Sequence, residues 1–249
     1  MKEYAEEGYR YAVSVDLSKY FDTLNHELLM NLLHRKIQDM RILRIIKKYL
    51  KSGVMENGVV CKTKEGSPQG GPLSPLLANI YLNEFDWEMH SRGVKTVRYA
   101  DDIVVFAKSK RAAERLLESS RRYLEGKLKL KMNTEKSKVT SIFAVKEFKF
   151  LGFCIGRNGS GIYIRAHRKS LNKAKEKLKL LTERNRGRNV RRVMAEVKVF
   201  IRGWLGYFHV AEMKRMMKSW DEWLRRRFRM YIWKQWKNCL LYTSDAADE

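Results

Sequence analysis

Three aspartates have the residue type and the surroundings for phosphoryl-transfer chemistry: Asp16, and the adjacent pair Asp101 and Asp102. Aspartate is ionised at pH 7, and neighbouring carboxylates repel each other, so a bound cation would relieve the cost of bringing them together. Hard oxygen ligands suit Mg²⁺. Two such ions about 3.5–4 Å apart can activate an attacking oxygen and stabilise a leaving one. These residues are therefore candidate catalytic and metal-binding residues, although adjacent acids also occur simply in turns.

The elements that must position these acids are predicted to be strands. Residues 11–17 alternate in polarity and predict a strand that ends at the first aspartate. Two apolar runs, 96–100 and 103–107, flank the acidic pair and predict a hairpin with both acids at its tip. Successive residues of an ideal strand point to opposite faces, so only one of the pair is expected to bind both ions, and Asp101 is favoured over Asp102.

The remaining pattern predicts an α+β fold, with helices packed on an antiparallel sheet, followed by helices alone. Further strands are expected at 59–63, 138–145 and 148–155. Helices are expected after a cap at Asn25, over 39–50, from Ser74–Pro75 onward and over 111–125. After about residue 166 three helices are expected: one with a face at Leu171, Ala174, Leu178 and Leu181, one capped by Asn189, and one over 211–236. Their methionine and aromatic residues are interpreted mostly as a helical core.

Positive charge is concentrated in the C-terminal third of the chain. The 249 residues carry 52 Lys and Arg against 28 Asp and Glu, a formal charge of +24. Residues 165–237 hold 23 of the basic residues and 6 of the acids, a net charge of +17. Such a field suits a polyanion, and the Trp and Tyr residues among these arginines favour nucleic acid, because bases stack on aromatic rings.

Composition excludes several other classes of protein. Hydrophobic residues make up 44%, which argues against disorder, and no apolar run is long enough to predict a membrane span. The first residues lack the apolar segment of a secretory signal. The three cysteines and five histidines have no metal-ligand spacing, so neither a disulfide framework nor a zinc site is expected.

Five sequence blocks, in order along residues 11–153, resemble the catalytic blocks of reverse transcriptases. VDLSKYFDTLNHELL contains Asp16, and RYADDIVVFAKS contains the YxDD motif at 99–102. SPQGGPLSPLLANIYLNEFD is similar to the block that precedes YxDD in the group II intron enzymes, and LKLKMNTEKSKVT and FKFLGF resemble the two blocks that follow it. The later segment DEWLRRRFRMYIWKQWK resembles the maturase-specific thumb, or X domain, of group II intron-encoded proteins.

The resemblance covers about residues 9–237 and implies a function and a fold. The function is that of an RNA-directed DNA polymerase that also binds its group II intron RNA, helps to splice it and supports its mobility. The fold is a polymerase right-hand palm followed by an all-α basic thumb. The implied domains are the palm at 1–164 and the thumb at 165–237. Residues 238–249 have no basic residue and no helix face, resemble translated adapter sequence, and are expected to be a non-native tail.

The resemblance also implies roles for single residues. Asp16, Asp101 and Asp102, with the backbone carbonyl of Leu17, would bind two Mg²⁺ ions. Phe21 matches the aromatic steric gate that excludes a ribose 2′-hydroxyl. The residues implied in nucleotide binding are Phe21, Gln69, Gly70, and either Lys136 or Lys138, between which the spacing does not decide. Those implied in the primer grip are Leu151, Gly152 and Phe153. Those expected to bind RNA are Arg191, Arg192, Arg202, Lys214, Arg215, Lys218, Arg225, Arg226 and Arg229.

The chain departs from the family at its N-terminus. Family members carry a fingers region before the first block, whereas here only residues 1–10 precede the first expected strand. The chain is therefore expected to be N-terminally incomplete and to be poorly active or inactive alone. No cysteine and histidine endonuclease motif follows the thumb. The expected partners are group II intron RNA, a DNA primer or target and dNTPs, with a possible homodimer and no membrane. The expected location is the cytoplasm of a bacterial-type cell, at the nucleoid.

Two alternative functions stay open. The first is an RNA-binding splicing factor whose polymerase blocks are vestigial, against which the three intact acids argue. The second is a reverse transcriptase of the retron or diversity-generating type, against which the maturase-like segment near the C-terminus argues.

Overall fold

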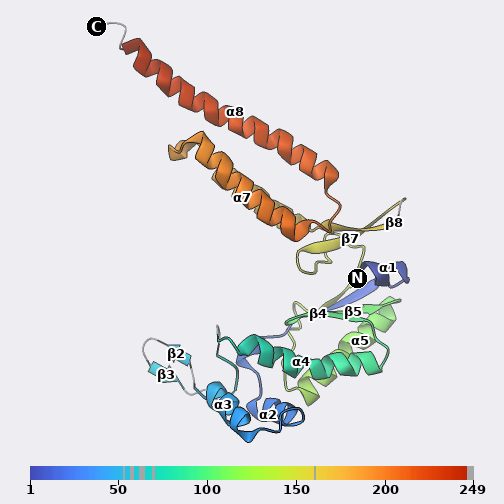
Figure 1. Cartoon of the computed structure of the whole chain (residues 1–249). Helices are drawn as coiled ribbons and strands as arrows, with labels where there is room; N and C mark the ends of the chain where they lie inside the picture. The colour runs from blue at the N-terminus through green and yellow to red at the C-terminus, as the bar shows by residue number, and fades with distance from the viewer. Residues whose placement is uncertain (53, 57–58, 62–64, 69–70, 160, 246–249) are drawn as a thin grey trace. The chain divides into compact units, whose positions relative to one another are not determined.

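The computed structural model describes residues 1–52, 54–56, 59–61, 65–68, 71–159 and 161–245, shown in Figure 1. It divides into two compact units, Met1–Ala144 and Val145–Glu249. We call them the sheet unit and the helical unit. This division by contacts falls earlier than the boundary of 164/165 expected between palm and thumb, which remains a prediction about functional domains.

The sheet unit is built on a four-stranded antiparallel sheet. Its strands, in the order β4-β5-β1-β6, are Thr96–Tyr99, Asp102–Ala107, Tyr11–Val15 and Lys138–Ser141. The strand predicted at 11–17 and the hairpin around the acidic pair are confirmed. The last strand ends at Ser141 rather than at 145, because residues 142–144 form a turn.

Helices and short elements complete the sheet unit. They are α1 (Lys2–Glu6), η1 (Tyr20–Asp22), α2 (His26–His34), α3 (Met40–Leu50), the strands β2 (Val54–Glu56) and β3 (Val59–Cys61), α4 (Ser74–Ser91), α5 (Lys110–Arg122) and η2 (Tyr123–Lys127). Asn25 caps α2, as predicted, because its side chain accepts a hydrogen bond from the Leu28 N–H at 3.0 Å. Asp39 caps α3 in the same way.

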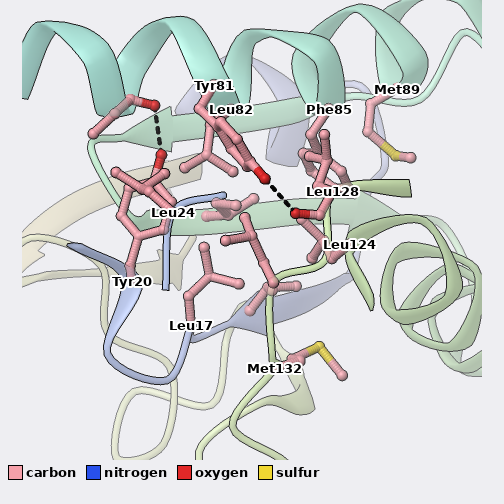
Figure 2. Close-up of a cluster of buried hydrophobic side chains, with 14 of the residues drawn as sticks. Leu17, Tyr20, Leu24, Tyr81, Leu82, Phe85, Met89, Leu124, Leu128 and Met132 are labelled. Carbon is pink, nitrogen blue, oxygen red and sulfur yellow. Dashed lines mark hydrogen bonds between the residues drawn. The ribbon is translucent and has the colours of Figure 1, made fainter. Parts of the chain in front are cut away.

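The core of the sheet unit lies between one face of the sheet and helices α2 to α5. Val13 and Val105, which pair across the two central strands, are fully buried against it. Figure 2 shows the part of this core below α4, where Tyr81 and Tyr20 are buried with their hydroxyl groups hydrogen-bonded. Tyr81 donates to the Leu128 carbonyl at 2.6 Å and Tyr20 donates to the Ala78 carbonyl. A buried phenol needs such a partner, so these bonds fix η1 and η2 to α4.

The helical unit begins with a hairpin and continues as three helices. Strands β7 (Phe153–Asn158) and β8 (Gly161–Ala166) pair with each other. They are followed by α6 (Arg168–Leu181), the short η3 (Arg184–Arg186), α7 (Val190–Phe208) and α8 (Lys214–Asp245). The single strand predicted over 148–155 is confirmed only from 153 onward, where β7 begins, because a turn at Leu151 and Gly152 precedes it. The second strand of this hairpin was not predicted.

The three predicted helices are confirmed, and they form the core of this unit. Leu178 of α6, Val197 of α7, and Trp220 and Leu224 of α8 are buried together. Helix α8 runs past the predicted end at 236 and continues to Asp245. Its late aromatic residues differ from the predicted core stripe, since Trp233 is 77% exposed. No helix among the described residues is long and apolar enough to cross a membrane.

Candidate active site

The acidic pair lies at a tight turn between β4 and β5. Tyr99 pairs with Asp102, so the loop consists of Ala100 and Asp101 alone. Ala100 has a φ of 54°, in the left-handed region, which costs a residue with a Cβ about 1–2 kcal/mol. Two-residue hairpin loops that match the twist of the strands require such a positive φ. The turn therefore presents Asp101 at the tip in a backbone conformation that the surrounding structure must support.

Asp16 reaches the same end of the neighbouring strand. The last pair between β1 and β5 is Val15 with Ile103, and one residue further the two chains arrive at Asp16 and Asp102. The backbone N–H of Asp16 donates to the Ser137 hydroxyl at 3.0 Å, and its carbonyl accepts from the Asn133 N–H at 2.8 Å. The three predicted acids are thus placed at one end of the two central strands.

The donor chemistry at this end fits Mg²⁺, because carboxylate oxygens are the ligands that this ion prefers. Neighbouring carboxylates repel one another in the absence of a cation. Among the described residues, however, no three Asp, Glu, His or Cys side chains lie close enough together to hold a metal ion. The structure therefore places carboxylates of the right chemistry on adjacent elements, but not close enough together to form a metal site. The binding of two Mg²⁺ ions stays a prediction.

Lys136 is the lysine that the structure places beside these acids. Its ammonium nitrogen lies 3.6 Å from a carboxylate oxygen of Asp16. Lys138, the other candidate, is exposed on β6, where it pairs with Ser14. The side chain of Lys136 is 69% exposed, so the ion pair itself contributes little to stability. Of the two lysines, Lys136 is the better placed to reach a ligand at Asp16.

Phe21 lies five residues after Asp16, on η1, and contacts the start of the glycine-rich block. Its ring is half-buried, and its centroid lies 5.4 Å from that of Tyr20. Its carbonyl accepts a hydrogen bond from the Ser67 N–H at 2.7 Å. The Ser67 hydroxyl in turn donates to Ser74 Oγ at 2.7 Å, at the start of α4. These bonds bring the predicted gate residue and the glycine-rich block together, while Gln69 and Gly70 lie outside the described residues.

Arg98, which was not predicted as a site residue, is bonded to the Ala100–Asp101 turn. Its guanidinium donates to both carboxylate oxygens of Asp86, through Nε at 3.0 and 2.9 Å and through a second nitrogen at 2.5 Å. The remaining nitrogen donates to the Asn79 side chain at 2.9 Å and to the Ala100 carbonyl at 3.0 Å. The signal in the sequence was an arginine three residues before Asp101, on the strand that leads into the turn.

The electrostatic surroundings of Tyr20 link this arginine to the acids. Burial raises the pKa of the Tyr20 phenol well above its usual value, Arg98 lowers it, and the charge of Asp101 raises it. The hydroxyl therefore stays protonated and continues to donate to the Ala78 carbonyl. Tyr20, Arg98 and Asp101 share one electrostatic environment next to α4.

The predicted primer-grip residues form a turn in the helical unit. Leu151 and Gly152 have φ values of 49° and 85°, and Phe150 and Phe153 bridge across them. The Leu151 carbonyl accepts a hydrogen bond from the Tyr207 hydroxyl at 2.9 Å, and the ring of Phe153 stacks on that of Tyr207. A side chain at Gly152 would meet Phe208, so the turn needs glycine for space as well as for conformation.

The residues predicted to bind RNA are all exposed on α7 and α8 or at their ends: Arg191, Arg192, Arg202, Lys214, Arg215, Lys218, Arg225, Arg226 and Arg229. Two of them form ion pairs within their own helix, Arg192 with Glu196 and Arg225 with Asp221. Arg227 is different, since it donates to the Thr182 hydroxyl and to the carbonyls of Lys179 and Thr182. The helical unit therefore combines a basic surface with one arginine that serves packing.

Comparison with known families decides what kind of protein carries these features. Residues 2–155 match the reverse transcriptase (RNA-dependent DNA polymerase) family. The chain belongs to that family. Residues 171–243 match the group II intron, maturase-specific domain. Both parts of the resemblance found in the sequence are confirmed, and the second match runs past residue 237 into the predicted tail at 238–249.

The curated relatives that the chain matches are longer than the chain. The protein YkfC of Escherichia coli is 36% identical in an alignment 185 residues long, which covers 61% of this chain and 48% of YkfC. The group II intron-encoded protein LtrA of Lactococcus lactis is 29% identical in an alignment 218 residues long, which covers 62% of this chain and 36% of LtrA. The chain thus spans about half of YkfC and about a third of LtrA.

A solved structure confirms the reverse transcriptase fold. The telomerase of Candida albicans, in complex with a fragment of telomeric RNA, superimposes with a TM-score of 0.52 at 14% sequence identity. The superposition covers 89% of this chain and 44% of the telomerase. At that identity the likeness concerns the fold alone.

Proposed function

We propose that this chain catalyses RNA-templated DNA synthesis for a group II intron and binds the intron RNA to assist its splicing. The reaction is attack of a primer 3′-hydroxyl on the α-phosphate of a dNTP. The observation that carries the proposal is the placement of Asp16 and the Ala100–Asp101 turn at one end of adjacent strands in a member of the reverse transcriptase family.

The roles of the residues in the sheet unit follow from this reaction. Asp16 and Asp101, supported by Asp102 and the Leu17 carbonyl, would hold two Mg²⁺ ions. When bound, these ions would lower the pKa of the attacking hydroxyl and stabilise charge on the phosphate. Asp16 is fixed through its backbone by Ser137 and Asn133, so the place of its carboxylate does not depend on the exposed ion pair with Lys136.

Substrate selection would depend on the neighbours of these acids. Phe21 would exclude a ribose 2′-hydroxyl, because its half-buried ring is held by Tyr20 and its backbone by Ser67. Gln69 and Gly70 would lie against the incoming nucleotide. Lys136, which already reaches Asp16, would place a positive charge near the triphosphate. Lys138 is the less well placed alternative.

The helical unit would hold the nucleic acids. The turn at Leu151, Gly152 and Phe153 would grip the primer end through its backbone, which Tyr207 supports. The nine exposed basic residues of α7 and α8 would contact intron RNA, and the exposed rings of Trp233 and Trp236 would offer faces for stacking of bases. A DNA target and a homodimer are further proposed partners, and the bacterial cytoplasm at the nucleoid is the proposed place of action.

Nucleotide incorporation tests the polymerase part of the proposal. Single-nucleotide extension of a primer on an RNA template, with enzyme in excess and long incubation, detects a slow reaction by a chain of this length. The variant Asp101→Asn should reduce the rate at least 100-fold. The matched control Asp221→Asn removes an exposed carboxylate of α8 and should leave the rate unchanged. Incorporation by Asp101→Asn at the wild-type rate would refute the metal assignment.

A splicing assay separates the alternatives. A group II intron RNA that splices faster in the presence of the chain supports the maturase role. Splicing assistance that survives Asp101→Asn without any incorporation by the wild type would favour the splicing factor with a vestigial polymerase site. Incorporation without any effect on splicing would favour a retron-type enzyme.

A further inference from the structure

The side chain of Arg98 has nearly all of its hydrogen-bonding capacity engaged by α4 and the catalytic turn. It is only 14% exposed, and its donors reach Asp86, Asn79 and the Ala100 carbonyl. A guanidinium is a planar fork whose donors have fixed directions, so satisfying three partners at once fixes its position. Asn79 and Asp86 lie seven positions apart, which places them on one face of α4 two turns from each other.

The bond from Arg98 to the Ala100 carbonyl acts on the strained residue of the turn. Ala100 has a φ of 54°, a conformation that persists only where its surroundings support it. Its carbonyl belongs to the peptide that leads directly into Asp101. Fixing that peptide therefore limits the directions that the Asp101 carboxylate can take.

Helix α4 also holds the segment that follows Asp16. The Tyr20 hydroxyl donates to the Ala78 carbonyl, one residue before Asn79, as Figure 2 shows. Tyr20 immediately precedes Phe21 on η1. The two segments that carry Asp16 and Asp101 are thus fastened to neighbouring positions of one helix, and the charges of Arg98 and Asp101 both act on the Tyr20 phenol.

We propose that Arg98 is a positioning residue of the polymerase site. With Asp86 and Asn79 it fixes the Ala100–Asp101 turn to α4, so that Asp101 keeps a constant place relative to the segment carrying Asp16 when a divalent cation binds. This inference rests on the proposed function, since it concerns the same site. It adds to that function a residue that touches neither substrate nor metal but determines how well the carboxylates receive the ion.

Two measurements on the same variants test this role. Hydrogen exchange followed by mass spectrometry reports the opening of the turn in peptides that contain residues 99–103. Binding of Mn²⁺, counted by electron paramagnetic resonance of the free ion, reports the cation site without requiring catalysis. Arg98→Gln and Asp86→Asn should each speed exchange in the turn at least tenfold and weaken Asp101-dependent Mn²⁺ binding about tenfold. Because the two residues act together, the double variant should be no worse than either single one.

Two controls separate positioning from general stability. Arg35→Gln removes an arginine that binds the same helix at Glu84 but has no hydrogen bond or ion pair with a described residue of the site, and it should change neither measurement. Arg98→Lys keeps the charge beside Asp86 but cannot reach Asn79 and Ala100 as well, so exchange in the turn should remain fast.

Each outcome decides the proposal. Unchanged exchange in Arg98→Gln overturns it, and so does faster exchange with unchanged Mn²⁺ affinity. A wild-type protein whose Mn²⁺ binding does not depend on Asp101 overturns the proposed metal site and this inference with it. That failure is distinguishable, because the exchange data still show whether Arg98 holds the turn.

Discussion

One arginine from each unit shows how the two units differ. In the sheet unit, Arg98 is almost buried and bonded to three partners. In the helical unit, Arg226 is exposed, and within the described residues its side chain has no hydrogen bond or ion pair. A group that aims a reacting carboxylate must be held in one place, whereas a phosphate backbone is attracted by mobile charges over a distance. The guanidinium held in one position therefore lies in the unit proposed to catalyse the reaction. The unpaired, exposed guanidinium lies in the unit proposed to bind RNA.

The largest predicted effect tests whether the sheet unit is tightly packed beside its proposed site. Gly66 has a φ of 89°, and a Cβ there would lie 2.8 Å from the backbone oxygen of Asp22, beside Phe21. Gly66→Ala should lower the free energy of unfolding by roughly 2–4 kcal/mol, because backbone strain and overlap add. Gly8 has nearly the same φ, 91°, with open space around it, so Gly8→Ala should cost only about 1 kcal/mol. Equal losses in chemical denaturation would show that the loop beside Phe21 is not tightly fitted.

The second prediction uses pH to test the anchoring of the core to α4. Burial raises the pKa of Tyr81 to about 12, from a usual value near 10. Above pH 10 the unfolded chain loses this proton and the folded chain keeps it, so stability present below pH 10 is lost as pH rises toward 12. The loss should approach about 1.4 kcal/mol per pH unit.

Tyr81→Phe should remove this part of the pH dependence, measured as the midpoint of urea unfolding at several pH values. Tyr99→Phe, at an exposed tyrosine, is the control and should leave the pH dependence unchanged. If both variants keep the wild-type slope, Tyr81 does not retain its proton in the folded protein.

The third and smallest effect sharpens the comparison within one helix, at two adjacent arginines. Arg227 is bonded to Thr182 and to the Lys179 carbonyl, so Arg227→Gln should cost about 1–2 kcal/mol of stability. Arg226→Gln should change stability by less than about 0.5 kcal/mol. In filter binding it should instead reduce the dependence of RNA affinity on salt, lowering the slope of the log–log plot by about 0.7–1. The opposite assignment of the two effects would contradict the division between packing and RNA contact.

Much of the sheet unit could be predicted because its signals are local. Alternation over 11–17, the side-chain cap at Asn25 and the acidic hairpin each depend on neighbouring residues, and each is present. The ordered blocks then identified the family, which no single motif would have done. The apolar pattern over 148–155 predicted a strand that starts too early, because Leu151 adopts a positive φ and forms a turn. The sequence signal for this turn was the next residue, Gly152.

The supporting contacts of the site could not be predicted, because they join residues far apart in the sequence. Ser137 meets Asp16 across 121 positions, and Tyr20 meets the Ala78 carbonyl across 58. The sequence shows an arginine three residues before Asp101. Only the structure shows that the partners of Arg98 are Asp86 and Asn79 on α4. Such partners depend on how helices pack on the sheet, which alternation and spacing do not specify.

One titration can test whether the sheet unit catalyses the reaction and the helical unit binds RNA. The rate of single-nucleotide incorporation is measured against the concentration of an RNA template, giving a maximal rate and a half-saturating concentration. We predict that Asp101→Asn lowers the maximal rate at least 100-fold and that Arg226→Gln raises the half-saturating concentration while the maximal rate stays within twofold. An Asp101→Asn protein with the wild-type maximal rate would contradict the account.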